Sequence, residues 1–151
     1  MADLTPLCQK LQTLWDTDFP LTHAMGMRVV SFTDHVLTTR SSLTPNNTNT
    51  HGTAFGGSLY AIEALTAWSL LWIEMQAAGL SGSIIHAHGS IDFARTVRED
   101  IVAVADFTTH VDALDELARN GKLRLTLTTQ VHADGELASR FEGDFTARID
   151  A

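Results

Sequence analysis

The segment from Asn49 to Ser58 has the residue types and spacing best suited to chemistry. Its polar loop leads through Gly56 and Gly57 into a long apolar run that predicts a helix. The first N–H groups of a helix have no partner within it, and the helix dipole places partial positive charge there. Glycines leave those N–H groups open to a ligand oxygen on which negative charge develops. We predict Asn49, Gly56 and Gly57 as catalytic groups, with Asn49 adding a side-chain donor.

A purely structural interpretation of this segment stays open. In that interpretation, Asn49 does no more than shape its loop, and the two glycines do no more than permit close packing. Three neighbours, His51, Phe55 and Ser58, are predicted to contact a substrate. His51 equally fits a solvated loop. Ser58 lacks the Gly-x-Ser-x-Gly context of a nucleophile and equally fits a helix start.

Further candidates lie outside the motif. Glu63 is the only carboxylate near the start of the long helix, so it could take a proton from water as a general base, or satisfy a neighbouring polar group. His86, Arg95 and Arg98 are predicted substrate contacts, the arginines through phosphate groups, although solvated roles remain open. His86 and His88 have the spacing of a metal pair, but no further ligands accompany them, so no metal is predicted.

The remaining pattern predicts the elements that position these residues. A helix begins at Thr5-Pro6 and ends before Phe19-Pro20, and a short helix runs from Asp112 to Asn120. Two strands are expected over Met25 to Phe32 and Val36 to Leu43, followed by the long apolar helix over Gly56 to Ala78. Four further strands are expected at Gly82 to Arg95, Ile101 to Thr109, Leu123 to Val131 and Leu137 to Phe145. An α+β fold follows, with one sheet around one long helix.

The long helix has more apolar surface than one small sheet covers, so a homodimer, and possibly a tetramer, is expected. The strand that begins at Gly82 is predicted to alternate between two faces. One face would carry Ile85, Ala87, Gly89, Ile91 and Phe93, and the other Ile84, His86, His88, Ser90 and Asp92.

Bulk composition limits the function classes. The 151 residues fit a single domain over 1–151, with 44% hydrophobic and 19% charged residues. A net charge of −8, with no block of Lys and Arg, disfavours a nucleic-acid partner, and none is expected. Cys8 is the only cysteine, and the start Met1-Ala2-Asp3 lacks a signal peptide pattern, so a cytoplasmic location is expected. No Lys or Arg flanks the apolar run closely, so no membrane partner is expected.

The strand–loop–helix order and the motif Asn49-x-x-Gly52-Thr53-x-Phe55-Gly56-Gly57 resemble the hotdog-fold thioesterase superfamily. The resemblance implies an antiparallel sheet wrapped around a long central helix. It also implies an acyl thioester substrate, carried by coenzyme A or acyl carrier protein, and no other cofactor. In that superfamily a similar Asn lines the site, and a Gly N–H polarises the thioester carbonyl.

A narrower branch, called "putative thioesterase", is similar in the stretch Phe55-Gly56-Gly57-Ser58-Leu59-Tyr60 and in Thr66-Ala67-Trp68 and Trp72. That branch occurs alone or behind an acetyltransferase domain, and it includes malonyl-ACP decarboxylases of fatty-acid synthesis. The chain departs from the superfamily twice. Phe55 replaces a His, and Ala64 stands where many members have a water-activating carboxylate, with Glu63 adjacent.

Three functions fit these observations. Hydrolysis of an acyl thioester would use the helix N-terminus and an acid such as Glu63. Decarboxylation of a malonyl thioester needs only donors that stabilise an enolate, so Ala64 is compatible with it. The two reactions are weighted about equally, and a non-catalytic acyl-carrier binding module is the remote alternative.

Overall fold

The computed structural model describes residues 4–150. The N-terminal sequence Met1-Ala2-Asp3, on which the signal-peptide expectation rests, lies outside them. The elements in chain order are α1 (Pro6–Asp18), α2 (Pro20–Ala24), β1 (Met27–Thr33), β2 (Val36–Ser41), the 3-10 turn η1 (Pro45–Asn47), α3 (Gly56–Ala77), β3 (Gly82–Phe93), β4 (Ile101–Asp106), the 3-10 turn η2 (Thr108–His110), α4 (Ala113–Asn120), β5 (Lys122–Ala133) and β6 (Glu136–Ile149).

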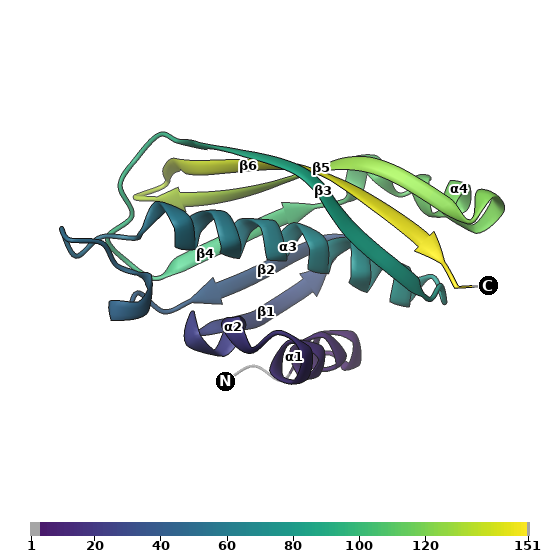
Figure 1. Ribbon diagram of the computed structural model, residues 1–151, viewed down its shortest axis with the longest axis horizontal. Helices are drawn as coiled ribbons and strands as arrows, with labels where there is room; N and C mark the ends of the chain where they lie inside the picture. The colour runs from purple at the N-terminus through teal and green to yellow at the C-terminus, as the bar shows by residue number, and fades with distance from the viewer. Residues whose placement is uncertain (1–3, 151) are drawn as a thin grey trace.

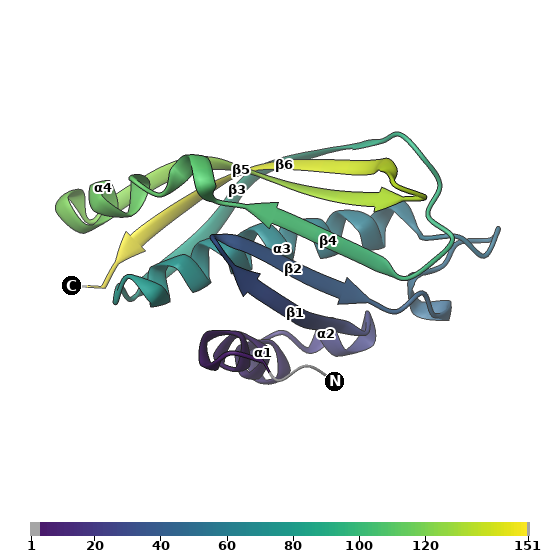
Figure 2. The same ribbon diagram turned by 180° about the vertical axis from the view of Figure 1, so that it is seen from behind.

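Six antiparallel strands form one sheet in the order β1-β2-β4-β5-β6-β3. The sheet curves around α3, and α4 lies at one end, as Figures 1 and 2 show. β3 joins the sheet at its far edge, beside β6, although it directly follows α3 in the chain. The expected hotdog fold, with an antiparallel sheet around a long central helix, is confirmed.

Apolar residues on all sides make α3 a core helix. Thirteen of its 22 residues are buried, among them Ile62, Leu70 and Leu71. The helix ends beside Gly79, whose φ of 72° is the left-handed conformation that commonly closes helices at glycine. The predicted boundary at Ala78 is therefore correct within one residue.

The N-terminal helices pack beside β1 and α3 (Figure 1). α1 begins at Thr5-Pro6 as predicted, and Thr5 caps it, because its Oγ1 accepts the backbone N–H of Cys8 at 3.4 Å. Trp15 is fully buried and donates its indole N–H to Ser69 Oγ at 3.0 Å. α1 therefore covers a flank of α3 that the sheet leaves open.

The predicted face pattern of β3 is wrong in its first half. A register irregularity in the β3–β6 pairing falls between His86 and His88, so Ala87 has no partner in the ladder. An extra residue of this kind reverses the alternation on either side of it. Directly paired residues point to the same face, and Ile84 and His86 oppose the buried Ala147 and Phe145.

Ile84 and His86 consequently share the inner face with Gly89, Ile91 and Phe93, whereas Ile85 shares the outer face with His88. His86 stacks on Phe145, with ring centroids 4.7 Å apart. The two histidines that were expected on one strand face therefore lie on opposite faces. Among residues 4–150, no helix is long and apolar enough to cross a membrane.

Candidate active site

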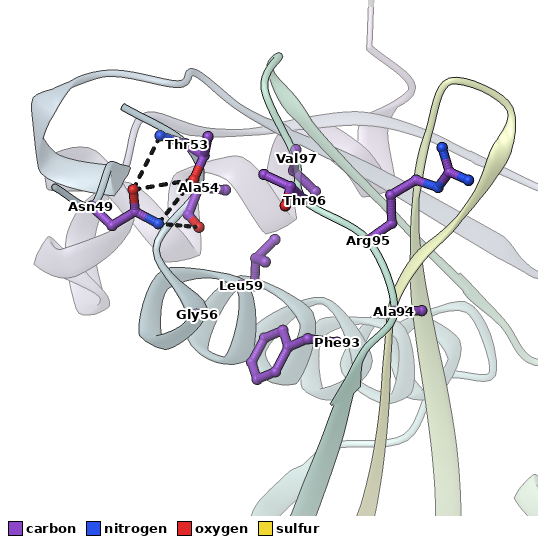
Figure 3. Close-up of a pocket in the computed structure, with 10 residues that line it drawn as sticks. All are labelled: Asn49, Thr53, Ala54, Gly56, Leu59, Phe93, Ala94, Arg95, Thr96 and Val97. Atoms are coloured by element: carbon purple, nitrogen blue, oxygen red, sulfur yellow. Dashed lines mark hydrogen bonds between the residues drawn. The ribbon is translucent and has the colours of Figure 1, made fainter. Parts of the chain in front are cut away.

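A cavity of about 330 Å³ lies where the 49–54 loop, the start of α3 and the end of β3 meet (Figure 3). Its ten lining residues come from these three segments. They are Asn49, Thr53, Ala54, Gly56, Leu59, Phe93, Ala94, Arg95, Thr96 and Val97. Segments some 40 residues apart in the chain are joined here by a backbone hydrogen bond of 2.9 Å from Ala54 N–H to Val97 O.

The N-terminus of α3 opens onto this cavity without a side-chain cap. Phe55 occupies the N-cap position in an extended conformation, and its own backbone N–H is used by Asn47 O at 2.7 Å. Phe55 O accepts from Leu59 at 3.0 Å, which closes the first turn. The N–H groups of the first helical residues thus lack an intrahelical acceptor and carry the positive end of the helix dipole.

Asn47, for which the sequence predicted no role, holds the start of α3 in place. Its side chain is fully buried, and its Nδ2 donates to Met25 O at 2.7 Å and to Ser42 O at 2.9 Å. A buried amide in a polar loop has no distinctive local pattern, because its partners lie in separate segments. Asn47 therefore fixes the loop from which α3 starts.

Asn49 lines the cavity, and its side chain is engaged by its own loop. Its Oδ1 accepts the backbone N–H of His51 at 2.9 Å and that of Thr53 at 3.2 Å, and its Nδ2 donates to Thr53 Oγ1 at 2.9 Å. Figure 3 shows the amide turned towards Thr53 and Ala54. These contacts match the loop-shaping interpretation of Asn49, and they leave its place on the cavity wall intact.

Both helix-start glycines face a phenyl ring. A Cβ on Gly56 would lie 3.2 Å from Phe93 Cζ, and a Cβ on Gly57 would lie only 2.4 Å from Phe55 Cε2. Both rings are more than half exposed. The glycines thus admit two aromatic rings at the helix N-terminus, in addition to leaving backbone N–H groups accessible.

Glu63 lies away from the cavity, inside the core of the protomer. Its side chain is fully buried, and Oε2 accepts from Ser139 Oγ of β6 at 2.7 Å. Burial raises the pKa of this carboxyl from the usual 4.5 to about 7, and hydrogen bonding from Ser139 and from the backbone of Phe141 opposes part of the rise. The neighbouring Ala64 lines a different cavity of about 240 Å³, together with Trp68 and His86.

The structure brings only some of the remaining predicted residues to the first cavity. Arg95 contributes to its wall, but its guanidinium pairs with Glu136 and points away from Asn49 in Figure 3. His51, Phe55 and Arg98 are exposed and Ser58 is buried, and none of these four residues lines the cavity. Among the described residues, no three His, Cys, Asp or Glu side chains gather as a metal site would require.

The fold, matched by solved structures and by a family model, places the chain in the hotdog-fold thioesterase superfamily. A thioesterase from Shewanella oneidensis, described as putative, has a similar structure, with 29% identity and a TM-score of 0.87 over 94% of this chain and 97% of that one. A Pseudomonas aeruginosa protein described as a probable thioesterase is 17% identical, with a TM-score of 0.79 over 97% and 98% of the two chains. A thioesterase from Haemophilus influenzae shares the fold at 10% identity, with a TM-score of 0.73 over 98% and 93%.

Residues 8–149 match the model of the family described as "Putative thioesterase (yiiD_Cterm)", and the chain belongs to that family. The resemblance found in the sequence motif is thereby confirmed. Family membership and the likeness to solved thioesterases support a thioesterase-type function.

Proposed function

We propose that this protein acts on an acyl thioester carried by coenzyme A or acyl carrier protein, and that the thioester carbonyl binds at the start of α3. The observation that carries the proposal is the uncapped helix N-terminus, with Gly56 in the wall of a cavity of about 330 Å³. Backbone N–H groups held in this way can stabilise a developing oxyanion. Asn49 and Thr53 give the same wall a polar character.

Decarboxylation of a malonyl-type thioester is the reaction that the site composition favours. Among the residues that the structure describes, none that lines this cavity carries a carboxyl or imidazole group. Hydrolysis needs a group that takes a proton from water, and Glu63 is buried against Ser139 instead. In decarboxylation the bond between the α-carbon and the carboxylate breaks, carbon dioxide leaves, and the electron pair forms an enolate. The helix N–H groups would hold the enolate oxygen until water protonates the α-carbon.

A second copy of the chain is part of the proposal. β3 is an edge strand of twelve residues, with Ile85 and Phe93 both more than half exposed. An unpaired edge strand of this length is a template for strand pairing with another chain. Phe93 also lines the cavity, so a copy that pairs along β3 would lie close to the bound thioester.

Product analysis tests the proposal directly. The protein is incubated with malonyl, acetyl and saturated acyl thioesters of pantetheine, coenzyme A and carrier protein. Free thiol is measured by colour reaction, and acyl products are measured by mass spectrometry. We expect acetyl thioester to accumulate from malonyl thioester without free thiol. Free thiol released from saturated substrates would establish hydrolysis instead, and a lack of both binding and turnover across the panel would overturn the thioester assignment.

A further inference from the structure

We infer that Glu63 is a positioning residue, which through Ser139 holds the two walls of the candidate site at a fixed separation. One wall is the start of α3, and the other is the segment that leaves β3. The inference rests on the proposed function where it concerns turnover, but the geometry on which it stands belongs to the fold.

The contacts around Glu63 connect α3 to β6 and β6 to β3, and β3 contacts the start of α3 again. Ser139 pairs with Phe93 in the β3–β6 ladder, and its hydroxyl donates to Glu63 Oε2 at 2.7 Å. Glu63 lies seven residues after Gly56 in α3, about 10 Å along the helix axis. The last of these contacts is at the cavity, where the Phe93 ring of β3 lies against Gly56 of α3.

Two further contacts reinforce this connection. The backbone carbonyl of Ala138, next to Ser139, accepts the N–H groups of Ala94 at 2.8 Å and Arg95 at 3.1 Å. Both residues line the cavity. On the helix side, Thr129 Oγ1 of β5 donates to the backbone carbonyl of Glu63 at 2.9 Å. One turn of α3 is thus hydrogen-bonded to β5 and β6, and β6 also holds the segment that leaves β3.

Packing alone does not account for a carboxyl at this position. Glu63 is fully buried, its Oε1 has no hydrogen-bond partner among the described residues, and none of the ion pairs among those residues includes it. Besides Ser139, only the backbone of Phe141, two residues further along β6, lowers its pKa within residues 4–150. A buried polar group that lacks a partner weakens a fold relative to an apolar side chain of similar size. The carboxyl accepts a directional hydrogen bond from Ser139, which an apolar side chain could not accept.

The test compares Glu63→Ala, Ser139→Ala and their combination with Glu63→Gln, which still accepts from Ser139 but cannot ionise. Thr39→Val is the matched control, because it removes another buried contact between α3 and the sheet, the 2.9 Å Thr39–Thr66 hydrogen bond. Amide hydrogen exchange at Ala94 and Arg95 and the amide NMR shifts of Gly56 and Gly57 report on the two walls. Steady-state kinetics supply kcat and KM for each variant.

We expect Glu63→Ala and Ser139→Ala each to speed exchange at Ala94 and Arg95 by about tenfold or more, to shift the Gly56 and Gly57 signals, and to lower kcat more than they change KM. The double variant should be no worse than either single variant, because both remove one contact. Glu63→Gln should restore wild-type shifts and turnover within a few-fold, and Thr39→Val should leave all four amides unchanged.

Unchanged amides and kcat in folded Ser139→Ala would overturn the inference, as would equal effects of Thr39→Val. If Glu63→Ala does not fold, the comparison of Ser139→Ala with Glu63→Gln decides the question. Failure of the proposed function would look different, since wild type would then turn over no thioester while the amide effects persisted.

Discussion

Phe93, the last residue of β3, lies against the first residue of α3, with its Cζ only 3.2 Å from the position that a Cβ on Gly56 would occupy. The ring comes from a strand at the sheet edge and meets a helix start 37 positions earlier in the chain, as Figure 3 shows. The contact leaves room for a hydrogen at Gly56, and a methyl group there would need the ring to move. The position of the Phe93 ring therefore depends on the size of the side chain at residue 56.

This coupling predicts the behaviour of Gly56→Ala. The added methyl should displace the Phe93 ring by a few tenths of an ångström and lower kcat/KM about tenfold, without loss of helix stability. In a Phe93→Ala background the same change should have little further effect. A double-mutant cycle on kcat/KM measures the difference. Equal losses in both backgrounds would show that the ring contact does not matter for turnover.

Asn49→Ala should impair both stability and turnover, because the Asn49 side chain holds its own loop as well as lining the cavity. The free energy of unfolding should fall by about 1–2 kcal/mol, the usual scale for one or two hydrogen bonds. Asn46→Ala is the matched control, since it removes a neighbouring loop contact, 2.8 Å to Ala24 O, outside the cavity. Urea titration and steady-state kinetics give the two readouts. Full activity of Asn49→Ala would show that the Asn49 side chain has no role in turnover.

The periodic parts of the fold could be predicted from the sequence. The apolar composition of α3 and the left-handed Gly79 behind it are local signals, as is the Asp134-Gly135 turn, where both residues have positive φ. The α+β fold class was predicted from the order of the helices and strands along the chain. The bulge at Ala87 gave no local signal, because it depends on how β3 aligns with β6. The faces of Ile84 and His86 were mispredicted for that reason.

The candidate site was predictable only in part, for a related reason. The helix start and Asn49 could be found because they adjoin in sequence. The opposite wall could not be assembled from the sequence, because Ala94 and Arg95 depend on the carbonyl of Ala138, more than 40 residues away. The direction of Glu63 likewise depends on Ser139, which no spacing along α3 reveals.

A histidine in the β1–β2 turn supports a second buried carboxylate. His35 Nδ1 lies 2.8 Å from Glu74 Oε1, and the Glu74 side chain is only 2% exposed. Burial raises the pKa of Glu74, and the His35 contact opposes that rise. His35→Ala should lower the unfolding free energy by about 1–2 kcal/mol, because it removes the contact to the buried Glu74 carboxyl. Denaturant titration measures this, and His35→Ala should cost less in a Glu74→Gln background, where no buried carboxylate is left without its partner.

Self-association should depend on the β3 edge. Sedimentation velocity at micromolar concentration should show a dimer, and Ile85→Lys should shift it towards monomer, because a charge on an edge strand disfavours pairing. Val104→Lys is the matched control, since Val104 is an exposed valine on the central strand β4. A folded wild-type monomer, or a dimer that Ile85→Lys leaves intact, would exclude association through this edge.

Stability should fall as the pH rises through the range in which Glu63 titrates. The unfolded chain releases the Glu63 proton near the usual pKa of 4.5, whereas the folded protein keeps it to about pH 7. The folded state binds more protons between these values, so this contribution is complete below pH 4.5 and lost by about pH 7. Its size is up to about 3 kcal/mol, at about 1.4 kcal/mol for each pKa unit.

Glu63→Gln removes this titration and keeps an acceptor for the Ser139 hydroxyl. The unfolding free energy of wild type should therefore decrease between pH 5 and pH 8 by more than that of the variant. Glu74 also has a raised pKa, but it is present in both proteins and cancels in the difference. Urea titrations at several pH values supply the comparison, and carboxyl-carbon NMR of Glu63 gives its pKa independently. Parallel stability curves, with a Glu63 carboxyl that titrates near pH 4.5, would show that this side chain is solvated in the folded protein.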